Sequence, residues 1–158
     1  MRNSPRAVSI LACLFILVSS SVALAANNWL GTWKLNVEAS KFSPGPAPRS
    51  QTLTFEATAG GIKLTSRTVD AKGKATKGEY VSNFDGKDVP WKGNADADTA
   101  SAKRIDDNSY ENTWKKGGAV TIVAKVVVSP DGKTLTLTQV GKNAKGQAVN
   151  NTVVLDRQ

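Results

Sequence analysis

Apolar and polar residues alternate along most of the chain beyond residue 28. Leu53 and Phe55 are separated by a threonine, and so are Leu135 and Leu137. A two-residue period is typical of antiparallel strands that bury one face and expose the other. No window has the apolar spacing of an amphipathic helix longer than about two turns. The pattern therefore predicts a chain built from strands.

Runs of this kind follow one another, with short turn sequences between them. We predict strands over residues 29–35, 50–57, 62–69, 75–84, 87–92, 99–105, 109–115, 119–128, 134–140 and 148–156. The turns between them contain glycine, aspartate, asparagine and proline, which adopt or fix the dihedral angles of tight hairpins. Residues of one parity in the run over 119–128 are expected to share a face: Val120, Ile122, Ala124, Val126 and Val128.

The lengths of the connections decide between two all-β architectures. A β-sandwich needs long crossovers between its sheets, whereas this chain has one long connection, over residues 36–49. We therefore predict an all-β fold with a single antiparallel up-and-down β-barrel of about eight to ten strands. Closure of a barrel removes exposed strand edges, and a barrel of this size can enclose a small ligand.

The first 25 residues have the parts of a secretory signal peptide. Arg2 and Arg6 precede an uncharged apolar run over residues 7–18, and small residues lead to a cleavage site after about Ala25. The run is too short to cross a bilayer. We therefore expect residues 1–25 to be removed and the domain over residues 26–158 to be periplasmic or secreted. An uncleaved anchor helix and a lipoprotein acylated at Cys13 are the alternatives.

A Gly-x-Trp motif opens the first predicted strand, at Gly31 and Trp33. It resembles the first strand of lipocalins and other calycins, the superfamily that includes the fatty-acid-binding proteins. The segment over residues 40–46 is similar to bacterial secreted lipocalin-like domain proteins, and the likeness covers nearly all of residues 26–158. The resemblance implies that Gly31 and Trp33 close one end of the barrel and that Arg157 packs across Trp33.

Two features depart from the fatty-acid-binding proteins. Those proteins place a helical pair between their first two strands, whereas Pro44, Pro46 and Pro48 exclude a long helix here. They also hold a ligand carboxylate with an Arg-x-Tyr pair, and Arg157 is followed by Gln158 instead. A likeness of fold does not by itself identify a ligand.

The amino-acid composition excludes the commonest kinds of catalytic site. The chain has no histidine, and its one cysteine lies within the predicted signal peptide. This excludes Ser-His-Asp and Cys-His catalysis and the usual zinc or copper sites. We therefore expect a protein that is not an enzyme and has no cofactor and no metal. A loose calcium site is the alternative to ordinary solvated turns for four aspartates: Asp96, Asp98, Asp106 and Asp107.

The basic charge is spread rather than concentrated. The net charge is +8, and removal of Arg2 and Arg6 leaves +6. The lysines are scattered through the turns and form no run or basic helix, which favours a role in solubility over nucleic-acid binding. The polar faces of the strands carry Thr, Lys, Glu and Asn, which argues against a membrane-embedded barrel. Nothing in the pattern addresses the oligomeric state.

Large side chains on the central strands are the candidate ligand contacts. We expect a small apolar or amphipathic ligand inside the barrel, held by Phe55, Leu64, Tyr80, Phe84, Trp91, Arg104, Tyr110 and Trp114. The aromatic rings either fill the core or line a cavity. Arg67 and Arg104 either face solvent or point inward, where they would favour an anionic head group. The alternative function is a filled barrel that acts through its loops as a scaffold or protein-interaction module.

Overall fold

The computed structural model describes residues 28–158, so the predicted signal peptide over residues 1–25 lies outside the described residues. The described part of the chain forms ten antiparallel strands and no helix. The strands are β1 (Gly31–Leu35), β2 (Ser50–Ala57), β3 (Ile62–Val69), β4 (Ala75–Ser82), β5 (Val89–Pro90), β6 (Thr99–Arg104), β7 (Ser109–Lys116), β8 (Ala119–Val128), β9 (Thr134–Lys142) and β10 (Ala148–Arg157). Each predicted strand is present, which confirms the all-β fold. No helix long and apolar enough to cross a membrane occurs in residues 28–158.

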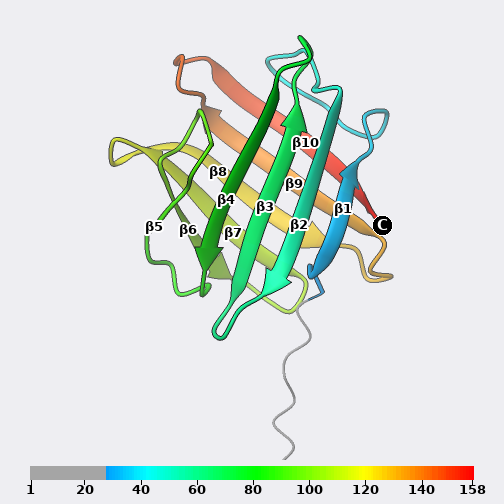
Figure 1. Cartoon of the computed structure of the whole chain (residues 1–158), viewed down its shortest axis with the longest axis vertical. Helices are drawn as coiled ribbons and strands as arrows, with labels where there is room; N and C mark the ends of the chain where they lie inside the picture. Colours follow the sequence, from blue (N-terminus) through cyan, green and yellow to red (C-terminus); the bar gives the residue numbers. More distant parts are fainter. Residues whose placement is uncertain (1–27) are drawn as a thin grey trace, which may run out of the picture.

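The ten strands form one sheet that curls into an up-and-down barrel (Figure 1). The sheet order is β4-β3-β2-β1-β10-β9-β8-β7-β6-β5, so sequence neighbours pair and β1 joins β10. The edge strands approach each other at a single bridge, where Glu79 and Lys92 exchange backbone hydrogen bonds of 2.9 and 3.0 Å. The predicted up-and-down barrel is therefore confirmed, and it is nearly closed.

Glycine is required at this seam between β4 and the segment after β5. Gly93 has a φ of 76°, a conformation that L-residues with a side chain adopt at a cost. A Cβ atom there would lie 1.9 Å from the carbonyl oxygen of Lys77 on β4. The two backbones can therefore approach closely enough to form the Glu79–Lys92 bridge only because residue 93 has no side chain.

The start of β1, the length of β5 and the alternation along β8 differ from the sequence prediction. β1 begins at Gly31, so Trp29 lies in the turn before it, and β5 is reduced to two residues. On β8, Val120 pairs with Lys115 while Ile122 pairs with Trp114, which leaves Thr121 as an extra residue in a β-bulge. Val120 is consequently 58% exposed, and the prediction that it shares the buried face of β8 is wrong because the bulge interrupts the alternation.

The long connection over residues 36–49 lies against β10 instead of forming helices. Lys41 and Thr152 exchange backbone hydrogen bonds of 2.7 and 2.8 Å, and the N–H of Asn150 donates to the carbonyl of Ser43 at 2.7 Å. The N–H of Ser43 in turn donates to the side-chain oxygen of Asn151 at 2.8 Å. The connection therefore extends the wall of the barrel at the upper end in Figure 1.

Aromatic side chains close the opposite end of the barrel. Trp29 and Trp33 are both fully buried, and the Trp33 indole N–H donates to the carbonyl of Trp29 at 2.7 Å. The guanidinium of Arg157 lies 4.2 Å from the centroid of the Trp33 ring and donates to the backbone carbonyls of Asn28, Leu30 and Gly132. This is the arrangement that the calycin resemblance implies for Trp33 and Arg157.

Gly31 has a direct role in that arrangement. Its φ is 116°, and a Cβ atom at this position would lie 3.2 Å from a guanidinium nitrogen of Arg157. The glycine of the Gly-x-Trp motif therefore leaves room for the cation that covers the tryptophan.

Candidate ligand-binding cavity

The inward side chains change from apolar to polar along the barrel axis. On β2, Phe55 and Leu53 are buried near the closed end, and Gln51 follows them toward the open end. On β3, Leu64 is followed by Ser66 in the same way. Because β2 and β3 run antiparallel, with Gln51 opposite Thr68 and Leu53 opposite Ser66, the polar side chains of both strands lie toward the same end of the barrel. The open half of the interior therefore has a polar wall above an apolar floor.

A cavity of about 370 Å³ occupies the open half of the barrel. Its wall combines aromatic and aliphatic side chains with neutral polar ones. The lining residues are Phe42, Pro44, Pro48, Gln51, Ser66, Thr68, Thr76, Gly78, Trp91, Gly93, Asn94, Ala95, Asp96, Trp114, Ile122, Gln139, Asn143, Val149, Asn151 and Val153. This volume is within the range of sites for small molecules.

Beneath this cavity the barrel is almost full. A second space of only about 40 Å³ lies among Phe55, Leu64, Tyr110, Asn112 and their neighbours. The two spaces share Gln51, Ser66, Trp91, Trp114 and Gln139 as lining residues. The floor of the large cavity is therefore made of closely packed side chains, with room for little more than water.

Two tryptophans form the main apolar surface of the cavity. The rings of Trp91 and Trp114 meet edge to face, with centroids 4.8 Å apart and an interplanar angle of 79°. Behind them, Tyr80 packs against Trp91 at a centroid distance of 4.8 Å. Both indole N–H groups are buried and have no hydrogen-bond partner among the described residues. Each is thus an unpaired donor on a residue that lines the cavity.

Side-chain amides form most of the polar wall. The Asn151 amide N–H donates to the side-chain oxygen of Gln139 at 3.0 Å. Deeper in the barrel, the Asn112 amide N–H donates to the hydroxyl of Tyr80 at 2.9 Å. The side-chain oxygen of Asn112 has no partner among the described residues although the residue is only 3% exposed. An unsatisfied buried acceptor is costly, so a group able to donate to it is favoured at this level.

Burial controls the ionisation of the two tyrosines. Desolvation raises the pKa of the Tyr80 phenol and that of the Tyr110 phenol well above the ordinary range. Both phenols therefore remain neutral at physiological pH, and they contribute hydrogen bonds and ring packing instead of acid–base chemistry.

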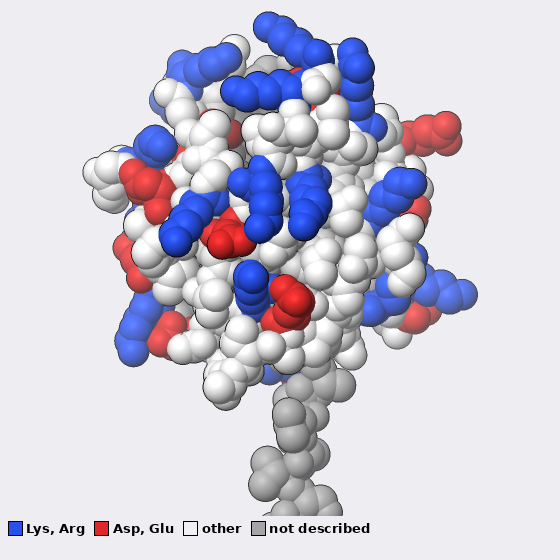
Figure 2. Space-filling model, viewed as in Figure 1, with Lys and Arg blue, Asp and Glu red and all other residues white. Residues whose placement is uncertain are grey.

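No lysine or arginine is among the described residues that line the cavity. Asp96 is the one charged side chain of that lining, and its carboxylate accepts a hydrogen bond from the N–H of Ala144 at 2.9 Å. The basic charge lies outside: Figure 2 shows basic and acidic side chains interspersed over one face of the barrel. The cavity is therefore close to neutral, whereas the exterior is charged.

Most of the residues predicted to contact a ligand lie around the small inner space. Phe55, Leu64, Trp91, Tyr110 and Trp114 line it, and Trp91 and Trp114 also line the large cavity. The other three predicted residues, Tyr80, Phe84 and Arg104, line neither space.

Phe84 and Arg104 belong to the closed end. Phe84 has a φ of 58° and packs against Trp29 and Tyr110 at centroid distances of 5.2 Å each. Trp29 itself contacts Tyr110 edge to face at 5.4 Å. These three rings fill the barrel at this end, so the prediction that Phe84 lines a cavity is corrected. The backbone leaves the β conformation after β4, which carries the Phe84 ring to the closed end.

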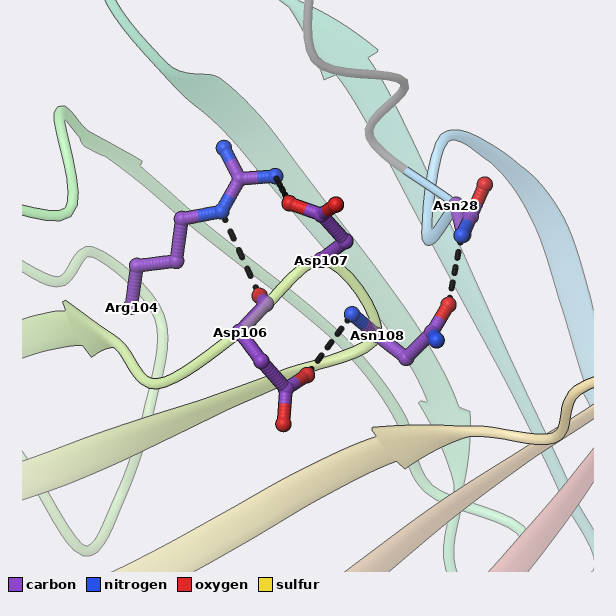
Figure 3. Close-up of polar contacts among 5 residues, drawn as sticks. All are labelled: Asn28, Arg104, Asp106, Asp107 and Asn108. Atoms are coloured by element: carbon purple, nitrogen blue, oxygen red, sulfur yellow. Dashed lines mark hydrogen bonds and ion pairs between the residues drawn. The ribbon is translucent and has the colours of Figure 1, made fainter.

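Arg104 is held at the surface by the turn that follows β6. Its guanidinium donates to the carboxylate of Asp107 at 3.1 Å and to the carbonyl of Asp106 at 3.3 Å (Figure 3). The guanidinium carbon also lies 5.2 Å from the ring centroid of Trp29. Figure 3 places Asn28 and Asn108, which form a hydrogen bond, beside this turn. Arg104 therefore covers the closed end and does not face the cavity, and Arg67 is exposed on the outside of β3.

The acidic residues considered for calcium do not come together. Asp96 and Asp98 precede β6, whereas Asp106 and Asp107 follow it, so the two pairs lie at opposite ends of that strand. Within residues 28–158, no group of three acidic, histidine or cysteine side chains is placed to hold a metal ion.

The polar wall was missed by the sequence interpretation. Gln51, Ser66, Gln139 and Asn151 all line the large cavity, and Phe42 reaches it from the long connection. Parity was the signal that could have found all four: Gln51 shares a face with Leu53, Ser66 with Leu64, Gln139 with Leu137, and Asn151 with Val153. Phe42 could not be placed, since only the pairing of its segment with β10 brings it to the cavity.

Comparisons with known proteins leave the chain without an assigned family. No protein-family model matches it, and no curated protein matches it. Among solved structures, the fold is similar to zebrafish ileal bile acid-binding protein complexed with cholic acid, with a TM-score of 0.49 and 9% identity over 83% of this chain and 99% of that chain. A similarity of this degree carries no argument about the ligand or activity of the present chain.

Proposed function

We propose that this chain is a non-catalytic binding protein that holds a small amphipathic molecule at the open end of its barrel. The cavity of about 370 Å³ is the observation that carries the proposal. Its wall offers two tryptophan rings and several amides, which suit a ligand with both apolar and hydrogen-bonding parts. The tryptophans are backed by Tyr80 and by each other, so the surface exists before a ligand arrives and little ordering is needed on binding.

Octyl β-glucoside below its micellar concentration is a suitable probe, because it is amphipathic and uncharged. We expect it to shift the indole N–H signals of Trp91 and Trp114 in an NMR titration of ¹⁵N-labelled protein. The signals of Trp29 and Trp33, which lie at the closed end, should not move. Equal shifts of all four indole signals, or no shift at all, would contradict the proposal.

A pair of variants on β3 provides the control. Ser66 points into the barrel and lines the cavity, whereas Arg67 is exposed on the outer face. Ser66→Phe should fill the cavity and abolish the shifts, and Arg67→Phe should leave them unchanged. Retention of binding by a folded Ser66→Phe variant would place the probe elsewhere and overturn the assignment.

The second candidate function is a scaffold or protein-interaction module. The packed closed half, with its inner space of only about 40 Å³, favours it. In that case the loops over residues 36–49 and 92–98 would supply the contact surface. Absence of any probe binding, together with capture of a partner that depends on these loops, would favour this candidate.

Export is part of the proposal and rests on the signal-peptide pattern of residues 1–25. Cell fractionation followed by N-terminal sequencing tests it. The protein should be recovered outside the cytoplasm with its N-terminus near residue 26, whereas a cytoplasmic protein beginning at Met1 would refute export.

A further inference from the structure

We infer that the cavity recognises an uncharged, polyhydroxylated ring, which is the chemistry of a neutral sugar. This inference rests on the proposed function and specifies its ligand class. It follows from the charge of the cavity, its depth, and the pairing of indole surfaces with unsatisfied polar atoms.

The charge of the lining disfavours an anion. An enclosed carboxylate or phosphate needs a cationic partner, because desolvation of an unpaired charge is costly. The described lining has no lysine or arginine, and its one charged residue, Asp96, is itself negative. Arg104 and Arg157, which could have supplied such a partner, are engaged at the opposite end of the barrel.

The depth of the cavity disfavours a long acyl chain. Leu53, Phe55 and Leu64 beneath it are 3%, 2% and 5% exposed, respectively. The space left between these side chains and their neighbours is about 40 Å³, and opening more would disrupt a close-packed core. A compact ligand fits this shape, because it uses the upper cavity without displacing the floor.

The tryptophans and amides together match the two kinds of surface on a sugar ring. The C–H face of such a ring is apolar and packs on an indole, while its hydroxyls radiate outward and both donate and accept hydrogen bonds. Trp91 and Trp114 supply the indoles, and Gln51, Gln139 and Asn151 supply amides around them. Gln139 and Asn151 bond to each other, and a purely apolar ligand would keep water from the hydrogen-bonding groups of the amides that this bond does not use, which costs free energy.

The unpaired indoles add an independent indication of a hydrogen-bonding ligand. The indole N–H groups of Trp91 and Trp114, two residues that line the cavity, have no acceptor among the described residues. A hydroxyl oxygen of a ligand can accept a hydrogen bond from an indole N–H. The side-chain oxygen of Asn112 lies instead in the packed floor below the cavity.

The test compares ligands that carry a sugar ring, an alkyl tail or a negative charge in different combinations. The probes are the methyl β-glycosides of glucose, galactose, mannose and N-acetylglucosamine, with sodium octanoate and octyl β-glucoside alongside. At least one methyl glycoside should shift the Trp91 and Trp114 indole signals in a saturable way, and octanoate should bind at least tenfold more weakly. If octyl glucoside and octanoate bind while every methyl glycoside fails, the inference is wrong and the proposed function stands. If no probe binds, both are wrong.

A variant pair tests the role of the amides. Gln51→Leu keeps the volume of a residue that lines the cavity but removes its hydrogen-bonding groups, so glycoside affinity should fall about tenfold. Gln158→Leu makes the same change at an exposed position outside the cavity and should leave affinity unchanged. Equal affinity in both variants would show that the amide wall does not recognise the ring. The near-ultraviolet circular dichroism of each variant verifies that it is folded.

Discussion

The seam of the barrel offers a sharp test of the fold, through the replacement of Gly93 by alanine. Gly93 and Gly86 both have a φ of 76°, so alanine pays the same conformational penalty at either position, about 1–2 kcal/mol. Their surroundings differ. No atom lies within 4 Å of a Cβ at Gly86, whereas a Cβ at Gly93 would lie 1.9 Å from the Lys77 carbonyl oxygen.

The additional cost at Gly93 can be estimated from what must move. Relief of the clash separates the backbone of β4 from residue 93, which breaks the two hydrogen bonds between Glu79 and Lys92. Each such bond contributes about 0.5–1.5 kcal/mol net. We therefore expect Gly93→Ala to lower the free energy of unfolding by about 2–5 kcal/mol, against about 1–2 kcal/mol for Gly86→Ala.

Urea unfolding followed by tryptophan fluorescence measures both values, and the difference should appear as a lower midpoint for Gly93→Ala with a similar slope. Hydrogen exchange at the amide of Glu79 gives a local readout, since this N–H should lose protection in Gly93→Ala and keep it in Gly86→Ala. Equal destabilisation by the two variants would refute the argument that the seam needs a glycine for close approach.

Three further predictions concern the closed end and the titration of the fold. Arg157→Ala removes three hydrogen bonds to backbone carbonyls and the cation above Trp33. Because water can replace the lost donors at these carbonyls, the unfolding free energy should fall by only about 2–3 kcal/mol in the same assay. A fall of less than about 0.5 kcal/mol, which is typical of an ordinary surface residue, would contradict this role. Tyr80 and Tyr110 are the chain's two tyrosines, and burial raises their pKa values. The native protein should therefore show no tyrosinate absorbance near pH 10–11. Its stability should fall as the pH rises above about 10, because the unfolded state releases these protons first. Backbone N–H groups of its own turn lower the pKa of Asp70, so stability should fall as pH drops below about 4, and Asp70→Asn should reduce that dependence; an unchanged acid profile would contradict the assignment.

Only some residues of the candidate site could be predicted from the sequence. Trp91 and Trp114 could be singled out because large aromatic residues within or beside the predicted strands are few, and both line the cavity. Phe84 could not be assigned correctly, since its ring direction depends on a positive φ after the end of β4. Arg104 faces outward because the turn at Asp106 and Asp107 captures its guanidinium, and that capture is a property of the folded turn.

The strands, the turns and hence the all-β class can be predicted from the amino-acid sequence alone. These features are local: a two-residue period and residues such as Gly86 report backbone conformation within a few positions. Three features follow from the fold: the bulge that turns Val120 outward, the seam at Gly93, and the cavity that Gln51 and Gln139 line together. These depend on register between strands far apart in the chain. The cavity inside the Gly-x-Trp barrel is therefore a product of register, which no single strand encodes.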